Sequence, residues 1–351
     1  MKKVQVPALA LAALCISTCM SASATAASTP QPDRIAGVRN IEDLAPIPGS
    51  EWVIGSSMAG GTATAGKLVA INAKSGEALS LYPAPNRANA KPNSGCPGQV
   101  AADAFKPHGI FLRPTTDGHT AQLYVVNHGG RESVEIFDIL SGATPGLRWT
   151  GCAMLPPGAF GNGVASSPDG GFFVTNMGKT LDGRDPITAM GGDIIAWTQA
   201  NGWRTIADSA IPAPNGLIAT QDGRTLYVAS WTGSTITELK LGEKTERRTV
   251  AVDFLPDNLR WSRNGTILVA GQATSVPDVI ACYTSTRDAC DIPSAVAEVD
   301  PASFTVRCSL PVALDMATVA ADLGEDIWVG TTRGDAVLRL PAATLHACAP
   351  S

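Results

Sequence analysis

The stretch NGVASSPDGGFFVTNM, from Asn162 to Met177, reads as a short strand, a Gly-bearing turn and a second strand rich in β-forming residues. The same pattern recurs as NGLIATQDGRTLYVASW from Asn215 to Trp231. Looser copies begin at Glu42, His108, Asn258 and Ala317. Each copy is followed by further strand-like segments, such as TITELKL from Thr235 to Leu241, so we expect four strands in each unit.

These six starts are spaced as β-propeller blades are, at roughly 40–50 residues per blade with some loop insertions. We therefore predict an all-β fold, a six-bladed β-propeller with four-stranded blades. A β-sandwich is the alternative, but it gives no reason for one strand-turn-strand unit to recur six times. The 35 Gly and 25 Pro residues also favour tight turns over long helices.

The composition excludes some classes of partner. With 44% hydrophobic and 16% charged residues, the chain can bury a sizeable core. The net charge is −5, and Lys and Arg are scattered singly along the chain. A polyanion needs a basic patch, so nucleic acid is not an expected partner.

The first residues resemble a secretory signal peptide. A basic Lys2-Lys3 pair precedes an apolar segment at 8–16 and a small-residue cleavage site at 24–26. We expect residues 1–26 to be removed and 27–351 to form a single propeller domain that is exported, either periplasmic or secreted. No later stretch approaches the roughly 18 apolar residues that a membrane span needs, so none is expected. The sequence does not determine the oligomeric state.

Cysteines support an oxidising compartment. Cys15 and Cys19 leave with the signal, unless Cys19 is a lipid anchor instead. Six cysteines remain: Cys96, Cys152, Cys282, Cys290, Cys308 and Cys348. The even number predicts disulfides, and no C-x-x-C supports a zinc site. Cys282 and Cys290 bracket a short polar loop and are the safest pair; Cys308 with Cys348 is the next choice, which leaves Cys96 with Cys152.

The repeats place one residue of each inner strand at a mouth of the central channel. The predicted ring consists of Glu42, His108, Asn162, Asn215, Asn258 and Ala317, with Asp43 and Asp257 beside two of them. Carboxylate and amide oxygens on separate rigid strands suit a hard cation, calcium better than magnesium. The alternative is that Asn and Asp only cap strand ends at a wet channel mouth.

A second ring follows where the second strand of each unit ends. Its predicted members are Ser57, His128, Met177, Trp231, Gln272 and Thr332. They are expected to wall a substrate pocket above the ion, and their mixture suits an apolar or aromatic ester-sized ligand. His108 and His128 could pass a proton between the rings, or each could simply cap a strand.

Several of these segments resemble the paraoxonase/arylesterase family, and more distantly the gluconolactonase-like and strictosidine synthase-like six-bladed propellers. Residues 107–110 (PHGI), 123–128 (LYVVNH) and 133–137 (SVEIF) are similar to the paraoxonase histidine region. Residues 42–43, 214–216 and 256–258 are similar to that family's calcium-binding segments. The resemblance implies a catalytic calcium held by Glu42, Asn162, Asn215, Asp257 and Asn258. It also implies that His108 acts as a general base on water, assisted by His128.

The same resemblance implies a second, structural calcium at Asp43 and the carbonyl of Ile110. The sequence departs from the family there, because Gly163 stands where the family has an Asp. A carboxylate is therefore missing from the predicted second site.

The leading hypothesis is an exported calcium-dependent hydrolase of carboxylic esters, a lactonase or arylesterase acting on a small-molecule ester or lactone. No serine-hydrolase, zinc-protease or nucleotide-binding motif competes with it. One alternative is a non-catalytic propeller that binds a ligand or partner protein and keeps calcium for its structure. Another is a relative that uses the scaffold for a condensation. Loops 83–105 and 273–294 are the longest connections, and we expect them to set substrate choice.

Overall fold

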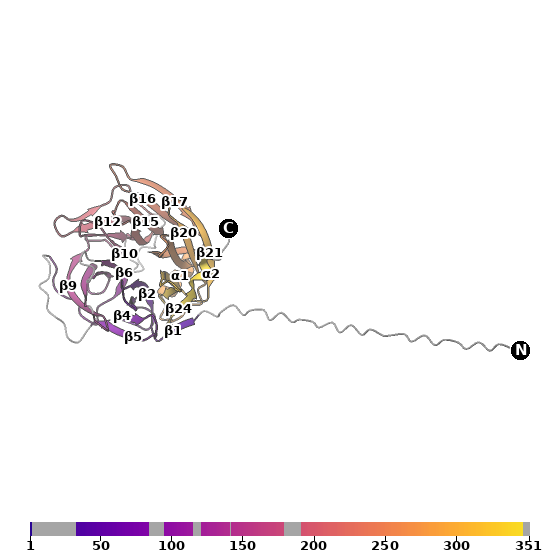
Figure 1. The fold of residues 1–351 in the computed structure, drawn as a ribbon. Helices are drawn as coiled ribbons and strands as arrows, with labels where there is room; N and C mark the ends of the chain where they lie inside the picture. Colours follow the sequence, from indigo (N-terminus) through magenta and orange to yellow (C-terminus); the bar gives the residue numbers. More distant parts are fainter. Residues whose placement is uncertain (2–32, 84–94, 115–120, 141, 179–190, 347–351) are drawn as a thin grey trace. The chain divides into compact units, whose positions relative to one another are not determined.

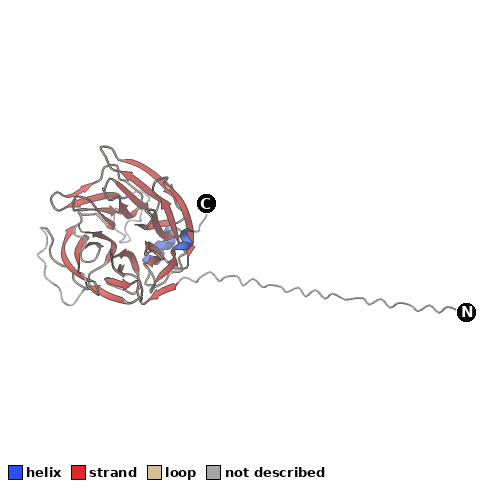
Figure 2. Ribbon diagram, viewed as in Figure 1, coloured by secondary structure: helices blue, strands red, loops and turns tan. Residues whose placement is uncertain are grey.

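Four-stranded antiparallel sheets follow one another around a central axis (Figure 1). The computed structural model describes residues 1, 33–83, 95–114, 121–140, 142–178 and 191–346. Within these residues there are six such sheets, so the predicted six-bladed β-propeller is confirmed. In this described part of the chain, the regular structure consists of strands and two short helices, α1 (Val276–Tyr283) and α2 (Ala342–His346) (Figure 2).

The strands follow the chain blade by blade. Blade 1 contains β2 (Ile41–Pro46), β3 (Trp52–Ser57), β4 (Lys67–Asn72) and β5 (Ala78–Tyr82). Blade 2 contains β6 (Pro107–Pro114), β7 (Ala121–Asn127), β8 (Ser133–Leu140) and β9 (Gly146–Met154). Blade 3 contains β10 (Gly161–Ser166), β11 (Phe172–Asn176), β12 (Asp193–Thr198) and β13 (Gly202–Thr205).

The second half repeats this arrangement. Blade 4 contains β14 (Pro214–Ala219), β15 (Thr225–Ser230), β16 (Thr235–Lys240) and β17 (Glu246–Ala251). Blade 5 contains β18 (Leu255–Trp261), β19 (Ile267–Gln272), β20 (Ser294–Asp300) and β21 (Thr305–Val312). Blade 6 contains β22 (Ala317–Asp322), β23 (Asp326–Thr331), β24 (Ala336–Pro341) and, as its outer strand, β1 (Asp33–Ala36).

The ring is closed by the pairing of β1 with β24, which joins the two ends of the propeller in one sheet. The antiparallel register sets Asp33 opposite Arg339, and these side chains also form an ion pair at 3.3 Å. Since both ends of the ring contribute to blade 6, opening the ring between blades 6 and 1 requires breaking the β1–β24 pairing as well as a hydrophobic contact.

The hydrophobic core lies between blades. Ile41 and Val53 of blade 1 pack with Trp328 of blade 6, and each other pair of neighbouring blades shares a comparable buried cluster. Burial of these side chains at roughly 25 cal/mol per Å² of apolar area is the main force that holds the blades around the axis. The inner strands are thereby fixed side by side.

Two predicted disulfides are present, Cys96–Cys152 and Cys282–Cys290, with Cα atoms 5.4 and 5.8 Å apart. Both predictions are confirmed. Cys308 is also disulfide-bonded, and its predicted partner Cys348 lies outside the described residues. So do residues 2–26 of the predicted signal peptide. In the described residues, no helix has the length and apolar character needed to cross a membrane.

Candidate functional site

A β-bulge interrupts the inner strand of every blade at the predicted ring. The register shifts lie between Ile41 and Asp43 in blade 1, between Pro107 and Ile110 in blade 2, and at corresponding places in the other four blades. A bulge leaves a residue out of the ladder and redirects its side chain. The bulged residues are Glu42, His108, Asn162, Asn215, Asp257 and Thr318, with a second residue in blades 2 to 5. The repeat therefore brings these polar groups to one level of the channel.

In two blades the register differs from the predicted ring. In blade 6, Ala317 pairs with Thr331, and the bulged residue is Thr318, whose hydroxyl donates to the Glu42 carbonyl at 2.7 Å. In blade 5, Asp257 is the structural equivalent of Asn162, while the predicted member Asn258 takes the second bulge position. One bulge shifts the alternation of side chains by one residue, and the strand pattern alone does not place it.

The ring contains buried oxygens that lack hydrogen bonds. In the described part of the chain, the Oδ1 atoms of Asn162, Asn215 and Asp257 are buried without a partner. The Asn162 amide nitrogen lies 3.2 Å from the Met177 sulfur, so its oxygen is the atom left over. Buried polar atoms are almost always paired, so three such acceptors on three blades are oxygens that could hold a cation.

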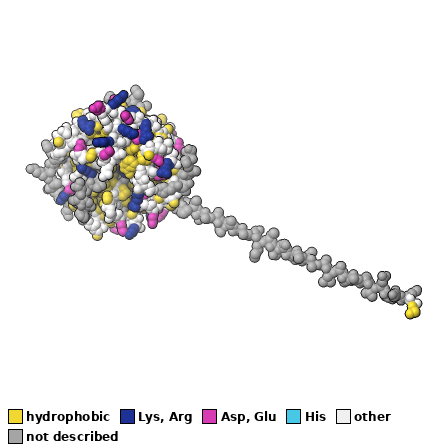
Figure 3. All heavy atoms as spheres, turned by 45° about the horizontal axis from the view of Figure 1, so that its top comes forward, with side chains coloured by type: hydrophobic (Ala, Val, Ile, Leu, Met, Phe, Trp, Pro, Cys, Tyr) yellow, Lys and Arg dark blue, Asp and Glu magenta, His cyan; other side chains and the backbone are white. Residues whose placement is uncertain are grey.

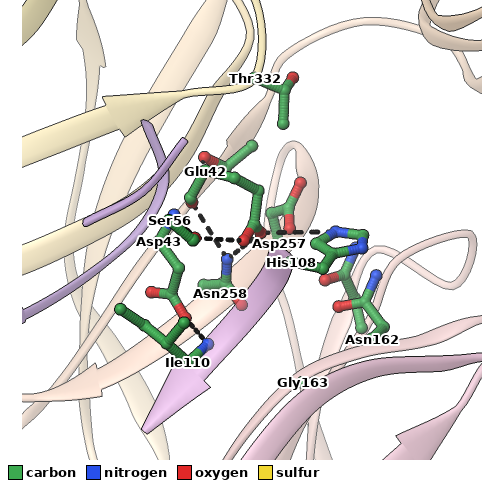
Figure 4. Close-up of polar contacts among 12 residues, drawn as sticks. Glu42, Asp43, Ser56, His108, Ile110, Asn162, Gly163, Asp257, Asn258 and Thr332 are labelled. Atoms are coloured by element: carbon green, nitrogen blue, oxygen red, sulfur yellow. Dashed lines mark hydrogen bonds and ion pairs between the residues drawn. The ribbon is translucent and has the colours of Figure 1, made fainter. Parts of the chain in front are cut away.

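Glu42 completes this group (Figure 4). It is fully buried, and its Oε1 accepts a hydrogen bond from Asn258 Nδ2 at 2.5 Å, while Oε2 accepts one from Ser56 Oγ at 3.4 Å. Asn258 thus directs its Nδ2 donor toward Glu42. A metal ion would instead be bound by the Oδ1 atom of an asparagine. Asn258 therefore lies next to the ring, and its side chain contacts the Glu42 carboxylate.

Asp257 is held by residues of the second ring. Gln272 Nε2 donates to Asp257 Oδ2 at 2.9 Å and to the Ala317 carbonyl at 2.8 Å. Trp231 Nε1 in turn donates to Gln272 Oε1 at 2.9 Å. Gln272 and Trp231 were predicted to wall a substrate pocket, and the structure uses both to fix the Asp257 carboxylate. The other carboxylate oxygen of Asp257 is thereby left for the channel.

Burial and mutual repulsion disfavour the ionised forms of the two ring carboxylates. Burial, followed by the nearby charges of Asp43 and Asp257, raises the pKa of Glu42 well above its usual value. Burial is also the main reason that the pKa of Asp257 rises to about 7. A buried carboxylate without a compensating charge takes up a proton instead of ionising. A divalent cation in the ring would relieve both groups.

A chain of side chains leads from this ring toward solvent. His108 Nε2 lies 3.6 Å from Glu42 Oε1, and His108 Nδ1 lies 2.7 Å from His128 Nε2. His128 Nδ1 contacts the Glu132 carboxylate at 3.0 and 3.1 Å, and its ring stacks on Phe160 with the centroids 4.3 Å apart. The structure therefore brings the predicted histidine pair into direct contact and adds Glu132, which the sequence analysis missed.

Burial, and then the neighbouring His128, lower the pKa of His108 well below 6.5. His108 is accordingly neutral at pH 7. A carboxylate on His128 Nδ1 favours the tautomer with the proton on that nitrogen. His128 Nε2 then accepts from His108 Nδ1, and the free lone pair of His108 is on Nε2, which faces Glu42. The geometry thus prepares His108 Nε2 to accept a proton.

The remaining predicted pocket residues lie around the same mouth. Thr332 is buried, and its Oγ1 is another atom without a hydrogen-bond partner in the described chain. Ser57 bonds instead to the Arg39 carbonyl at 2.7 Å. Met177 packs beside a cluster that joins Trp231 and Met316 to α1.

Helix α1 brings a further residue that the sequence analysis missed. It lies in the long 273–294 connection, and its end is tied down by the Cys282–Cys290 disulfide. Burial, followed by the nearby charge of Asp257, raises the pKa of Tyr283 at its C-terminus. The Tyr283 ring faces the Arg333 guanidinium at 5.2 Å. The only signal in the sequence for a residue of this connection near the polar ring of the channel is the length of the connection.

The residues of the predicted second calcium site also come together. Asp43 Oδ2 accepts a hydrogen bond from the Ile110 amide at 2.8 Å, and the same carboxylate pairs with the Arg260 guanidinium. Arg260 was not among the predicted site residues.

The donor set consists mainly of carboxylates and amides. Among the described residues, no three His, Cys, Asp or Glu side chains form a metal-binding group. Two carboxylates with amide oxygens are instead a set for a hard cation. On the face in Figure 3, Lys and Arg side chains are interspersed with Asp and Glu side chains, in agreement with the scattered charges of the sequence.

Comparison with known families now identifies the group. Residues 89–287, more than half of the chain, match the SMP-30/Gluconolactonase/LRE-like region. The chain belongs to this family. This match does not confirm the resemblance to the paraoxonase/arylesterase family. Among curated proteins no significant match was found.

Solved structures with the same fold are distant in sequence. A putative gluconolactonase is 14% identical, with 89% of this chain and 92% of that chain covered at a TM-score of 0.57. A luciferin-regenerating enzyme is 11% identical, with 91% and 98% covered at 0.58. Regucalcin of Agrobacterium tumefaciens str. C58, a calcium-binding protein, is 14% identical, with 88% and 92% covered at 0.54. At these identities the similarity establishes the fold alone.

Proposed function

We propose that the protein is an exported, calcium-dependent hydrolase of carboxylic esters that acts on lactones or aryl esters. The observation that carries this proposal is the set of three buried, unpartnered oxygens of Asn162, Asn215 and Asp257, grouped in the ring that also contains Glu42 and neutral His108. Membership in the gluconolactonase-like family and the calcium binding of its relative regucalcin support it.

The ring fits calcium by the chemistry of its donors. Asn162, Asn215 and Asp257 each have an acceptor to give, and Glu42 supplies a second carboxylate. Asn258 would join them if its amide rotated to exchange nitrogen for oxygen. Calcium bound there would polarise an ester carbonyl and stabilise the oxyanion that forms from it.

The side chains of the protein supply the proton transfers. His108 Nε2 accepts a proton from a water molecule as the water oxygen bonds to the ester carbonyl carbon. His108 Nδ1–H, bonded to His128 Nε2, stabilises the imidazolium that results, and Glu132 holds His128 in the required tautomer. When the ester C–O bond breaks, the proton passes from His108 to the leaving oxygen. The products are a carboxylic acid and an alcohol, which remain joined when the substrate is a lactone.

The substrate would bind above the ring that contains Glu42, among the side chains of the predicted second ring. Met177 is only partly buried and would provide apolar surface, Trp231 is buried in the adjoining cluster, and Thr332 has a hydroxyl without a partner in the described chain. Tyr283 borders the same region from α1. This mixture favours a compact ester with an apolar or aromatic part over a polyanion.

Export is part of the same proposal. The Cys96–Cys152 and Cys282–Cys290 disulfides are typical of an oxidising compartment. A test is N-terminal sequencing of the mature protein from a fractionated expression host. A first residue near 27 in the periplasm or medium would support export, and an intact N-terminus in the cytoplasm would contradict it.

The decisive experiment is hydrolysis of phenyl acetate and a series of γ- and δ-lactones by the purified mature protein. Turnover is measured before EGTA treatment, after it, and after addition of calcium or, as a control, magnesium. We expect activity to disappear with EGTA and return with calcium only. If no substrate is turned over but EGTA lowers Tm, the protein is a non-catalytic propeller stabilised by calcium. Full activity in EGTA would overturn the metal mechanism.

A further inference from the structure

A second buried charge cluster lies one residue further along the inner strands, at Asp43. The side chains of Asp43 and Arg260 are only 1% and 12% exposed. Asp43 Oδ1 accepts a hydrogen bond from the Leu44 amide at 2.8 Å, and Oδ2 accepts one from the Ile110 amide at 2.8 Å and pairs with Arg260 Nη2. Unlike the oxygens of the calcium ring, both carboxylate oxygens here have partners.

Arg260 joins three blades through its guanidinium. It extends from β18 of blade 5, and its Nε donates to the Leu44 carbonyl of blade 1 at 3.0 Å. Its Nη2 donates to the Ile110 carbonyl of blade 2 at 2.8 Å. These partners are 216 and 150 residues away in the chain. Nη1 donates to the carbonyl of Leu259 at 2.7 Å. The positive charge therefore sits at a junction of inner strands, surrounded by oxygens.

Two of the oxygens that Arg260 contacts are the ligands that the resemblance to paraoxonases implies for a second calcium. Both the Asp43 carboxylate and the Ile110 carbonyl bond to the same nitrogen of Arg260. The site consequently does not fit a second metal ion, because the Arg260 guanidinium already binds both of the implied ligands, the Asp43 carboxylate and the Ile110 carbonyl.

Gly163 gives independent support. A Cβ added there would lie 2.9 Å from Gly216 Cα and 3.0 Å from both the Asn215 carbonyl oxygen and the Leu217 nitrogen. All three atoms belong to the backbone of the neighbouring blade, so no side-chain rotation can relieve these contacts. A carboxylate at this position, the third ligand of the paraoxonase pattern, would need the inner strands of blades 3 and 4 to move apart.

We propose that the Arg260 guanidinium is a permanent, covalently tethered replacement for the second cation, so that each chain binds one calcium ion instead of two. The fold then keeps its central positive charge when calcium is removed. Calcium would control only the ring at Glu42 and Asp257, so removal of the ion would be reversible and would leave the propeller folded. The part of the proposal that concerns Arg260 does not depend on hydrolytic activity.

The test combines metal counting with thermal unfolding of the full mature chain. The protein is stripped with EGTA, titrated with calcium chloride by calorimetry, and its bound calcium is counted by atomic emission after dialysis. We expect one calcium ion per chain, and two would overturn the proposal. The Arg260→Gln variant is melted in EGTA beside Arg263→Ala, which alters an exposed arginine of the same hairpin.

Arg260→Gln should lower Tm by at least about 5 °C in EGTA, because Asp43 loses its buried partner. The Arg263→Ala control should change Tm little. An unchanged Tm for Arg260→Gln in EGTA would overturn the structural role. If Arg260→Gln does not fold, the calcium count of the wild-type chain still decides the proposal.

If the wild-type chain binds no calcium at all, the proposed function is refuted. The Tm of Arg260→Gln in EGTA would then still decide the structural role of Arg260.

Discussion

Two acidic clusters lie next to each other on the inner strands and differ in how their charge is balanced. At Asp43, burial also raises the pKa of the carboxylate, but that carboxylate is bonded to two backbone amides and to Arg260. At Glu42 and Asp257, burial keeps the pKa values high, and buried oxygens lack hydrogen-bond partners within the described residues. The first cluster is balanced by the protein's own atoms, whereas the second has acceptor oxygens left over for the proposed calcium ion. We therefore interpret the first cluster as structural and the second as the candidate functional site.

The largest expected effect is on the incomplete cluster. Asp257→Asn removes a carboxylate from the calcium ring and should lower kcat/KM at least about 1000-fold, as measured with the best lactone or aryl ester. The same change should leave Tm in EGTA unchanged or higher, because it removes a negative charge near Glu42. Asp335→Asn, at an exposed site, is the matched control. Activity within tenfold of wild type would refute the role of Asp257.

The complete cluster should respond in the opposite way. Asp43→Asn leaves the Arg260 charge buried and should lower the free energy of unfolding by about 3 kcal/mol, with or without calcium, in urea titrations. Asp326→Asn breaks the more exposed Asp326–Arg339 pair and should cost about 1 kcal/mol or less. Equal losses for the two variants would show that the central pair has no special role.

The histidine chain should separate catalysis from metal binding. His108→Gln should lower kcat about 100-fold while calcium affinity, measured by calorimetry, stays near the wild-type value, because His108 moves protons and is not a ligand. Glu132→Gln should have a smaller effect, since it acts through the tautomer of His128. If His108→Gln keeps full activity, His108 is not the base, and Asp257 becomes the candidate.

A smaller effect is expected from pH. With the pKa of Asp257 raised to about 7 in the metal-free protein, its folded form holds a proton more tightly than its unfolded form, so stability without calcium should fall as pH rises from about 4 through 7. Calcium must displace that proton below pH 7, so its affinity should be at least about tenfold weaker at pH 5.5 than at pH 8. Calorimetry at the two pH values measures this. The dependence should shrink in Asp257→Asn, and an unaltered dependence there would assign it to another group.

Much of this could be predicted from the residues. The recurrence of one strand-turn-strand unit predicts the blades, because every blade packs between two neighbours and therefore has a similar pattern of apolar residues in its strands. The disulfides Cys96–Cys152 and Cys282–Cys290 were also predicted correctly. The sequence left open whether His108 and His128 form a pair, and the structure brings them into contact. The ring registers of blades 5 and 6 were not, because a bulge moves a side chain by one position without changing the pattern of the strand.

The sequence by itself determined which residue types lie on the inner strands, since periodicity is a local property of the chain. Only the tertiary structure decided which of them are partners. Arg260 donates a hydrogen bond to Leu44, which is more than two hundred residues away in the chain. Gln272 was expected to line a pocket, but its side chain holds the Asp257 carboxylate. Whether a buried carboxylate is neutralised from within or left for a metal ion depends on such contacts, because electrostatic compensation acts through space and not along the chain.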